Sequence, residues 1–135
     1  MKEAVQYHYP VDDQEIFGII GTEGFERLVA AFYRQIPDDP ILGPMYPKED
    51  LAGAERRLRD FLIFRFGGPQ HYLENRGHPR LRMRHAPFPV DAAARNRWME
   101  IMTAALLETG LPNEVNGMLW EFFNSVATAM MNREG

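Results

Sequence analysis

Cysteine is absent from the sequence, and no run of apolar residues approaches the length of about 20 that a membrane-spanning helix needs. Without cysteine the chain can form no disulfide, thiolate metal site, iron–sulfur cluster or cysteine nucleophile. The N-terminus also lacks the apolar core of a signal peptide. We therefore expect a cytoplasmic protein with no membrane partner.

A surplus of positive charge is missing as well. The chain has 15 Lys and Arg residues against 19 Asp and Glu residues, a formal net charge of −4. Such a chain has little non-specific attraction for a phosphate backbone, which argues against a nucleic-acid partner. The 135 residues, of which 45% are hydrophobic and 25% charged, suit one globular domain.

Apolar side chains recur at the helical i, i+3, i+4, i+7 spacing in four long stretches, and no segment alternates with period two. Thr22, Asp50 and Asp91 are of the types that cap helix N-termini. Pro37 and Gly110 are of the types that end helices. The predicted fold class is therefore all-α, with helices over residues 22–36, 50–66, 91–110 and 112–130.

Each predicted helix has one apolar face that we expect to form the core. The faces comprise Phe25, Leu28, Val29, Phe32 and Ile36; Leu51, Ala54, Leu58, Phe61, Leu62 and Phe66; Ala94, Trp98, Ile101, Met102, Ala105 and Leu106; and Val115, Met118, Leu119, Phe122, Val126 and Met130. Nine Phe, five Tyr, two Trp and eight Met residues suit an interior shaped around a flat apolar group. They equally suit a plain helical core.

The helical pattern lapses between Gly67 and Pro89, and a long irregular segment in a small domain is usually functional. Three of the four histidines fall there, at a spacing of seven: His71, His78 and His85. Equal spacing would align them on one helix face, which suggests a metal site. A helix is broken at 77–79 by glycine and proline, however, so the spacing carries no geometric meaning.

His85 is the strongest single candidate among these histidines. It closes a short stretch that could form a helical turn, and Pro87 ends any such turn just beyond it. One imidazole facing an aromatic-rich cavity is what a haem iron needs as its fixed axial ligand. On this argument alone haem is one option among several, and a structural histidine is the commoner case.

Several segments together resemble the truncated haemoglobins, most closely their second group. Agreement runs in register from Glu15 to Asn132. The run Gly-His-Pro-Arg-Leu-Arg-Met-Arg-His at 77–85 is highly specific. The other matching segments are Phe32-Tyr33, Met45-Tyr46-Pro47, the residues from Asp50 to Ala54, Phe66-Gly67-Gly68-Pro69, and Trp98.

The resemblance implies a two-over-two helical sandwich around haem b over residues 14–133, with residues 1–13 as an N-terminal extension. His85 matches the ligand on the proximal side of the iron. Tyr33, Tyr46 and Trp98 match three polar-tipped aromatics that stabilise a ligand on the distal side. The positions that match the apolar wall of the haem pocket are Phe32, Ala54, Leu58, Phe61, Leu62, Met83 and Met102.

Haem carries two propionates, and guanidinium groups pair well with carboxylates. We expect Arg57 and Arg84 to bind the propionates, with Tyr72, His78 and Arg82 as weaker candidates that are equally suited to solvated surface. A phosphate-binding patch is the other interpretation of the arginine run, and the acidic net charge argues against it.

We expect the sixth coordination position of the iron to stay open, because Ala54 cannot coordinate it. O2, CO and NO are then the expected ligands, with slow release rather than bulk oxygen transport. One alternative is a haem enzyme, a peroxidase or an NO dioxygenase with an unidentified electron donor such as a reductase. Another is a haem-free helical interaction module. The sequence leaves the oligomeric state open, a homodimer included.

Overall fold

A computed structural model of the chain describes residues 11–69 and 90–131, and within these ranges every regular element is a helix. This confirms the all-α prediction. The α-helices are α2 (Ile16–Arg34), α3 (Leu51–Arg65), α6 (Ala92–Thr109) and α7 (Asn113–Ala129). Three short 3-10 turns accompany them: η1 (Asp13–Glu15), η2 (Gly43–Met45) and η3 (Lys48–Asp50).

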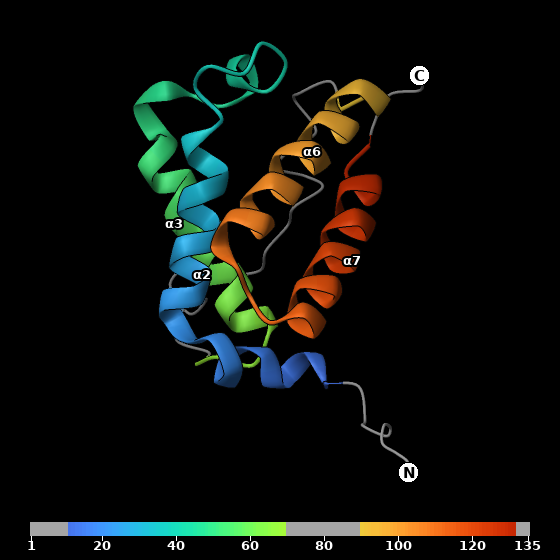
Figure 1. Cartoon of the computed structure of the whole chain (residues 1–135). Helices are drawn as coiled ribbons and strands as arrows, with labels where there is room; N and C mark the ends of the chain where they lie inside the picture. Colours follow the sequence, from blue (N-terminus) through green and yellow to red (C-terminus); the bar gives the residue numbers. More distant parts are fainter. Residues whose placement is uncertain (1–10, 70–89, 132–135) are drawn as a thin grey trace.

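The helices form two pairs. α2 packs against α3, α6 packs against α7, and α2 also contacts α6 (Figure 1). In Figure 1 the α2–α3 pair lies on one side and the α6–α7 pair on the other. This arrangement is the expected two-over-two sandwich. In the described part of the chain, none of the helices combines the length and the apolar character needed to cross a bilayer.

Helix α2 begins six residues before the predicted start at Thr22. Gly21 kinks it there with a φ of 68° and a ψ of −179°, a conformation open essentially to glycine alone. The predicted helix is thus the part after the kink. Its apolar face is confirmed, since Phe25, Leu28 and Phe32 are completely buried.

The predicted N-caps of α3 and α6 differ in what their side chains do. The Asp91 carboxylate accepts a hydrogen bond from the Ala94 backbone N–H at 2.9 Å, as a capping residue should. Asp50 also stands at the N-cap position of α3, but its side chain caps no backbone group. It instead accepts a hydrogen bond from Arg57 at 2.7 Å.

The buried face of α7 differs from the predicted one. Val115, Leu119, Phe123 and Ala127 are buried at a spacing of four, whereas the predicted Phe122 is only partly buried. Residues 122 and 123 are both phenylalanines, so periodicity alone cannot decide which of them turns inward. Met118, Val126 and Met130 are likewise only partly buried.

Residues 11–13 pack onto the helical sandwich. The backbone N–H of Val11 donates to Glu114 at 2.6 Å, and Val11 also packs against the core. Asp12 and Glu15 form a reciprocal capping box over η1. Asp13 pairs with Arg65 at the end of α3, at 3.1 Å. The segment thereby connects the start of α7 to the end of α3.

Candidate functional site

Tyr33, Tyr46 and Trp98 form a group that we call the polar aromatic cluster. Its members come from α2, from the segment between α2 and α3, and from α6. The rings of Tyr33 and Tyr46 lie 5.7 Å apart between centroids, edge to face. Phe32 connects them to the third member, with its ring centroid 5.1 Å from those of both Tyr33 and Trp98. Three segments distant in sequence thus bring their hydrogen-bonding tips to one place.

The two phenols of this cluster hold their protons firmly. Burial raises the pKa of Tyr33 well above its usual value of 10.0, and the neighbouring Tyr46 raises it further. Burial also raises the pKa of Tyr46, to about 12, although a side-chain hydrogen bond with Trp98 lowers it in part. Because an indole can only donate, Trp98 is the donor in that bond. At neutral pH the cluster therefore presents three hydrogen-bond donors.

Aromatic contacts continue from the cluster into the apolar end of the molecule. The Trp98 ring contacts that of Phe123 at 5.7 Å, and Phe123 contacts Phe122 at 5.6 Å. Phe122 reaches Phe61 of α3 at 6.4 Å. A line of rings therefore runs from α6 through α7 to α3.

Four apolar residues of α3, which we call the α3 stripe, pack on the core and yet keep part of their surface exposed: Leu51, Ala54, Leu58 and Phe61. Met118 and Phe122 of α7 are partly buried in the same way. Behind them Phe32, Leu62 and Met102 are completely buried. An apolar surface of this kind beside a set of hydrogen-bond donors fits a flat, apolar group such as haem.

Arg57, one of the predicted propionate-binding residues, lies on α3 and pairs with Asp50 at 2.7 Å. Gly53 makes room for this ion pair, because a Cβ at that position would lie 2.3 Å from an Asp50 carboxylate oxygen. The Arg57 charge also lies near enough to Tyr33 to lower the pKa of that phenol slightly. The pair therefore borders the polar aromatic cluster.

The other predicted site residues lie outside the described residues: His85, Arg84, Tyr72, His78, Arg82 and Met83. All four histidines of the chain, including His8 and His71, are outside them too. Within the described ranges, no group of three or more His, Cys, Asp or Glu side chains could hold a metal ion. The predicted iron ligand thus stays a prediction.

Sequence reasoning missed an ion pair between a buried carboxylate and a partly exposed arginine next to the cluster. Asp39 is 5% exposed and accepts a hydrogen bond from Arg97, which directly precedes Trp98. Burial by itself would raise the pKa of Asp39, but the Leu42 backbone N–H and Arg97 together hold it below its usual range. An aspartate that accepts hydrogen bonds from backbone N–H groups two or three residues ahead is a known turn pattern. The partner 58 residues away has no signal in the sequence.

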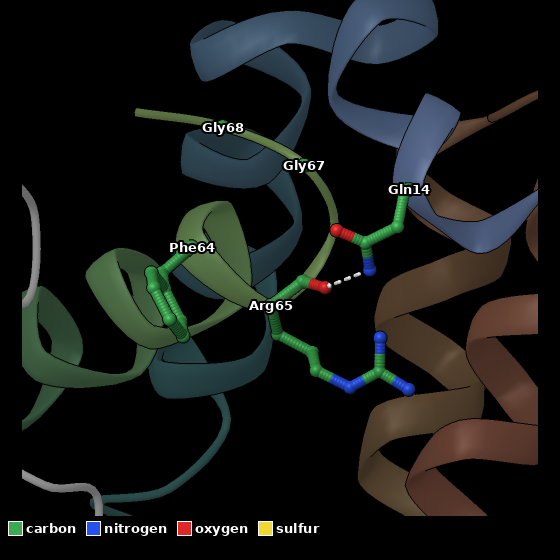
Figure 2. Close-up of a pocket in the computed structure, with 5 residues that line it drawn as sticks. All are labelled: Gln14, Phe64, Arg65, Gly67 and Gly68. Atoms are coloured by element: carbon green, nitrogen blue, oxygen red, sulfur yellow. Dashed lines mark hydrogen bonds between the residues drawn. The ribbon is translucent and has the colours of Figure 1, made fainter. Parts of the chain in front are cut away.

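A hollow of about 510 Å³ lies beside the end of α3, lined by Gln14, Phe64, Arg65, Gly67 and Gly68 (Figure 2). The Gln14 amide points toward the Arg65 carbonyl oxygen and donates to it at 2.9 Å. The Arg65 guanidinium is engaged elsewhere, over the rings of Phe66 and Phe122. These groups join structural elements and carry no chemistry of their own.

Comparison with known proteins places this geometry in a family. The profile of the family described as bacterial-like globin matches residues 15–132. The group 2 truncated hemoglobin YjbI of Bacillus subtilis is 36% identical over 114 residues, which cover 84% of this chain and 86% of that protein.

Solved structures agree with this assignment. The hemoglobin of the thermophilic bacterium Chloroflexus aurantiacus superposes with a TM-score of 0.83 at 45% identity, covering 87% of this chain and 98% of that one. The truncated oxygen-avid haemoglobin of Bacillus subtilis superposes with a TM-score of 0.80 at 35% identity, covering 86% and 98%. The chain therefore belongs to the bacterial-like globin family and, within it, to the group II truncated haemoglobins.

Proposed function

We propose that this globin binds haem b, with His85 as the protein ligand to the iron, and holds O2 and other diatomic gases with slow release. Globins carry haem and bind small gaseous ligands, and a similar protein from Bacillus subtilis is an oxygen-avid haemoglobin. The observation that carries the proposal is the convergence of Tyr33, Tyr46 and Trp98 beside a partly exposed apolar surface.

When bound, haem supplies an iron that takes small diatomic ligands reversibly and can exchange electrons. The α3 stripe and the completely buried Phe32, Leu62 and Met102 form the apolar wall that keeps water out. Tyr33, Tyr46 and Trp98 direct protonated donors at a ligand that carries partial negative charge. In a dry site each such hydrogen bond is stronger than it would be in water.

The propionates need cations at the rim of the pocket. Arg57 is the described residue that we assign to this role, and Asp50 orients its guanidinium. We propose Arg84 as the second cation, with Tyr72, His78 and Arg82 as further hydrogen-bond donors. Arg57→Met should therefore loosen haem without changing the hydrogen bonds to a bound gas.

Peroxidase or NO dioxygenase chemistry would make the protein an enzyme that needs an electron donor such as a reductase. Peroxide cleavage is normally assisted by a positioned acid–base group. The polar tips of the described cluster are two phenols with raised pKa values and one indole, and none of these is a base at neutral pH. The cluster therefore favours ligand binding over peroxide turnover.

Absorption spectra of the purified protein with and without CO test the proposal. We expect a haem Soret band that shifts on addition of CO to the reduced protein. His85→Ala should lose or loosen haem, whereas His71→Ala and His78→Ala should keep the wild-type spectrum. A colourless protein that takes up no added haem would refute the function, and an unchanged Soret band in His85→Ala would refute the ligand assignment. Rapid mixing with peroxide or NO separates the binding protein from the enzyme.

A further inference from the structure

The segment between α2 and α3 carries Tyr46, and a buried carboxylate fastens it to α6. One oxygen of Asp39 accepts a hydrogen bond from Arg97 Nε at 2.5 Å. The other oxygen accepts from the backbone N–H groups of Leu42 at 2.8 Å and Ile41 at 3.1 Å. Both oxygens are used, so the carboxylate joins the loop backbone directly to a side chain of α6.

Little freedom remains between this carboxylate and Tyr46. The Gly43 N–H donates to the Asp39 carbonyl at 2.9 Å, and the Met45 N–H donates to the Leu42 carbonyl at 2.9 Å. The Tyr46 N–H then donates to the Gly43 carbonyl at 3.3 Å. A series of local backbone hydrogen bonds therefore links Asp39 to Tyr46.

Helix α6 contacts this loop through two consecutive residues. Arg97 pairs with Asp39, and the next residue, Trp98, donates its indole N–H to Tyr46. Successive residues of a helix point in directions about 100° apart, so one turn of α6 contacts the loop at two different places, Asp39 and Tyr46. The ion pair and the indole bond thus join the same two elements.

We propose that Arg97 and Asp39 are positioning residues that hold the Tyr46 hydroxyl against the Trp98 indole. They thereby set how firmly the pocket retains a diatomic ligand, a consequence that rests on the proposed function. Breaking the pair frees the loop to move Tyr46 away, so that a bound ligand loses the Tyr46 hydroxyl as a hydrogen-bond donor. Because the Arg97 side chain is 39% exposed, the ion pair by itself contributes little to stability, which favours a geometric role.

The Arg34–Glu108 pair offers a matched control. It joins α2 to α6, both of its side chains are more than half exposed, and neither partner belongs to the segment between α2 and α3 that carries Tyr46. Removing Arg34 costs the molecule one charge and one ion pair, whereas removing Arg97 also breaks its ion pair with Glu100 at 2.9 Å. Arg34→Met therefore controls for the loss of a charge and an ion pair, and Asp39→Asn, which leaves the Arg97–Glu100 pair in place, isolates the pair that the proposal needs.

The first test is the indole N–H signal of Trp98 in nuclear magnetic resonance spectra of the CO-saturated protein. The chain has one other tryptophan, Trp120, whose indole donates to Thr103 at 3.0 Å, and it serves as an internal standard. Arg97→Met should shift the Trp98 signal and speed its hydrogen exchange about fivefold or more, since its hydrogen bond opens more often. The Trp120 signal should stay in place, and Arg97→Lys should restore part of the protection.

The second test is a double-mutant cycle on oxygen release. Arg97→Met should accelerate release about three- to tenfold with Tyr46 present and less than about twofold in a Tyr46→Phe background, because coupled residues are non-additive. Asp39→Asn keeps a side-chain oxygen that can accept from the Leu42 backbone N–H, and it provides a second variant should Arg97→Met fold poorly. Arg34→Met should change neither rate.

Equal acceleration in both backgrounds, or an unmoved Trp98 signal, would overturn the positioning role while leaving haem binding intact. A chain that bound no haem would refute the proposed function instead. The indole measurement would then be made on the protein as purified, and its outcome would still decide the positioning role.

Discussion

Trp98 is the residue on which the polar end of the pocket depends. Its ring contacts Phe32 and Phe123, and its indole N–H bonds to Tyr46. The indole can donate but not accept. A ligand that accepts a hydrogen bond can therefore replace Tyr46 as the partner of the indole. A ligand that accepts none leaves the bond between Trp98 and Tyr46 intact.

Trp98→Phe should accelerate oxygen release about ten- to hundredfold. A hydrogen bond to a partly charged acceptor contributes about 1.5–3 kcal/mol, and 1.4 kcal/mol corresponds to a factor of ten. CO is less polar when bound, so its release should change much less. Flash photolysis and ligand replacement give both rates, with Trp120→Phe as the control.

Equal acceleration of oxygen and CO release in Trp98→Phe would point to a steric role and contradict the hydrogen-bond argument. Tyr33 and Tyr46 can turn toward the ligand once the indole is gone. We therefore expect Tyr46→Phe to be non-additive with Trp98→Phe.

Tyr46 should make the protein less stable in alkali. Its pKa rises from 10.0 in the unfolded chain to about 12 in the folded one, mainly because it is buried. Between these values the unfolded state has lost a proton that the folded state keeps. The free energy of unfolding therefore falls as the pH rises from about 10 through about 12, by at most about 1.4 kcal/mol per pH unit for this group.

Denaturant unfolding at several alkaline pH values checks this expectation. Tyr46→Phe should show a shallower decline of the unfolding free energy than the wild type, and so should Tyr33→Phe, whose pKa is also raised. An identical slope in the wild type and in Tyr46→Phe would show that the phenol does not titrate differently on unfolding.

At the scale of the element, the turn after α3 depends on one glycine. Gly67 has a φ of 98°, and a Cβ placed on it would lie 1.9 Å from the Gln14 carbonyl oxygen. That contact is with backbone, so it cannot be relieved by rotating a side chain. The end of α3 and the segment before α2 can approach each other closely only because this residue has no side chain.

Gly67→Ala should lower the free energy of unfolding by about 2 kcal/mol or more, because it adds backbone strain to a steric clash. Gly117 in α7 is the matched control, since nothing lies within 4 Å of a Cβ there and its φ is ordinary. Gly117→Ala should stabilise the protein by about 0.5–1 kcal/mol. Thermal and denaturant unfolding measure both effects. If Gly67→Ala left the free energy of unfolding unchanged, the turn would be able to adjust its backbone at little energetic cost.

Helix positions were the most predictable elements, because caps and breakers are local signals. Asp91 caps α6 and Gly110 ends it with a φ of 69°, both as predicted. The phase of α7 was not predictable where Phe122 and Phe123 are adjacent, since periodicity cannot choose between two identical neighbours. The kink at Gly21 escaped prediction because the predicted helix began only at Thr22, one residue beyond it.

Contacts become harder to predict from the sequence as the number of residues between the two partners grows. The polar aromatic cluster was expected only through the resemblance, since no spacing rule relates Tyr33, Tyr46 and Trp98. The Asp39–Arg97 pair joins residues 58 positions apart and belongs to no motif that we identified. Such contacts arise from how the segment after α2 packs against α6, and a single sequence does not encode them locally.

Ligand access is also a property of the whole molecule, since a gas must cross from solvent to the interior. The α3 stripe is partly exposed, and Ala54 is its smallest member. Its neighbour Gly53 is buried beneath the Asp50–Arg57 pair, so the helix surface is closed on that side. The smallest barrier along α3 should therefore lie at Ala54.

Ala54→Trp should slow CO association about tenfold, which corresponds to about 1.4 kcal/mol on the barrier. Thermal stability should change little, because Ala54 is not fully buried and the added ring can extend into the approach to the pocket. Ala52 is exposed on the same helix, so Ala52→Trp adds equal bulk facing solvent and should leave the association rate unchanged. Rapid mixing with CO measures both variants. An association rate that Ala54→Trp leaves unaltered would show that gases reach the pocket by a route that does not pass α3.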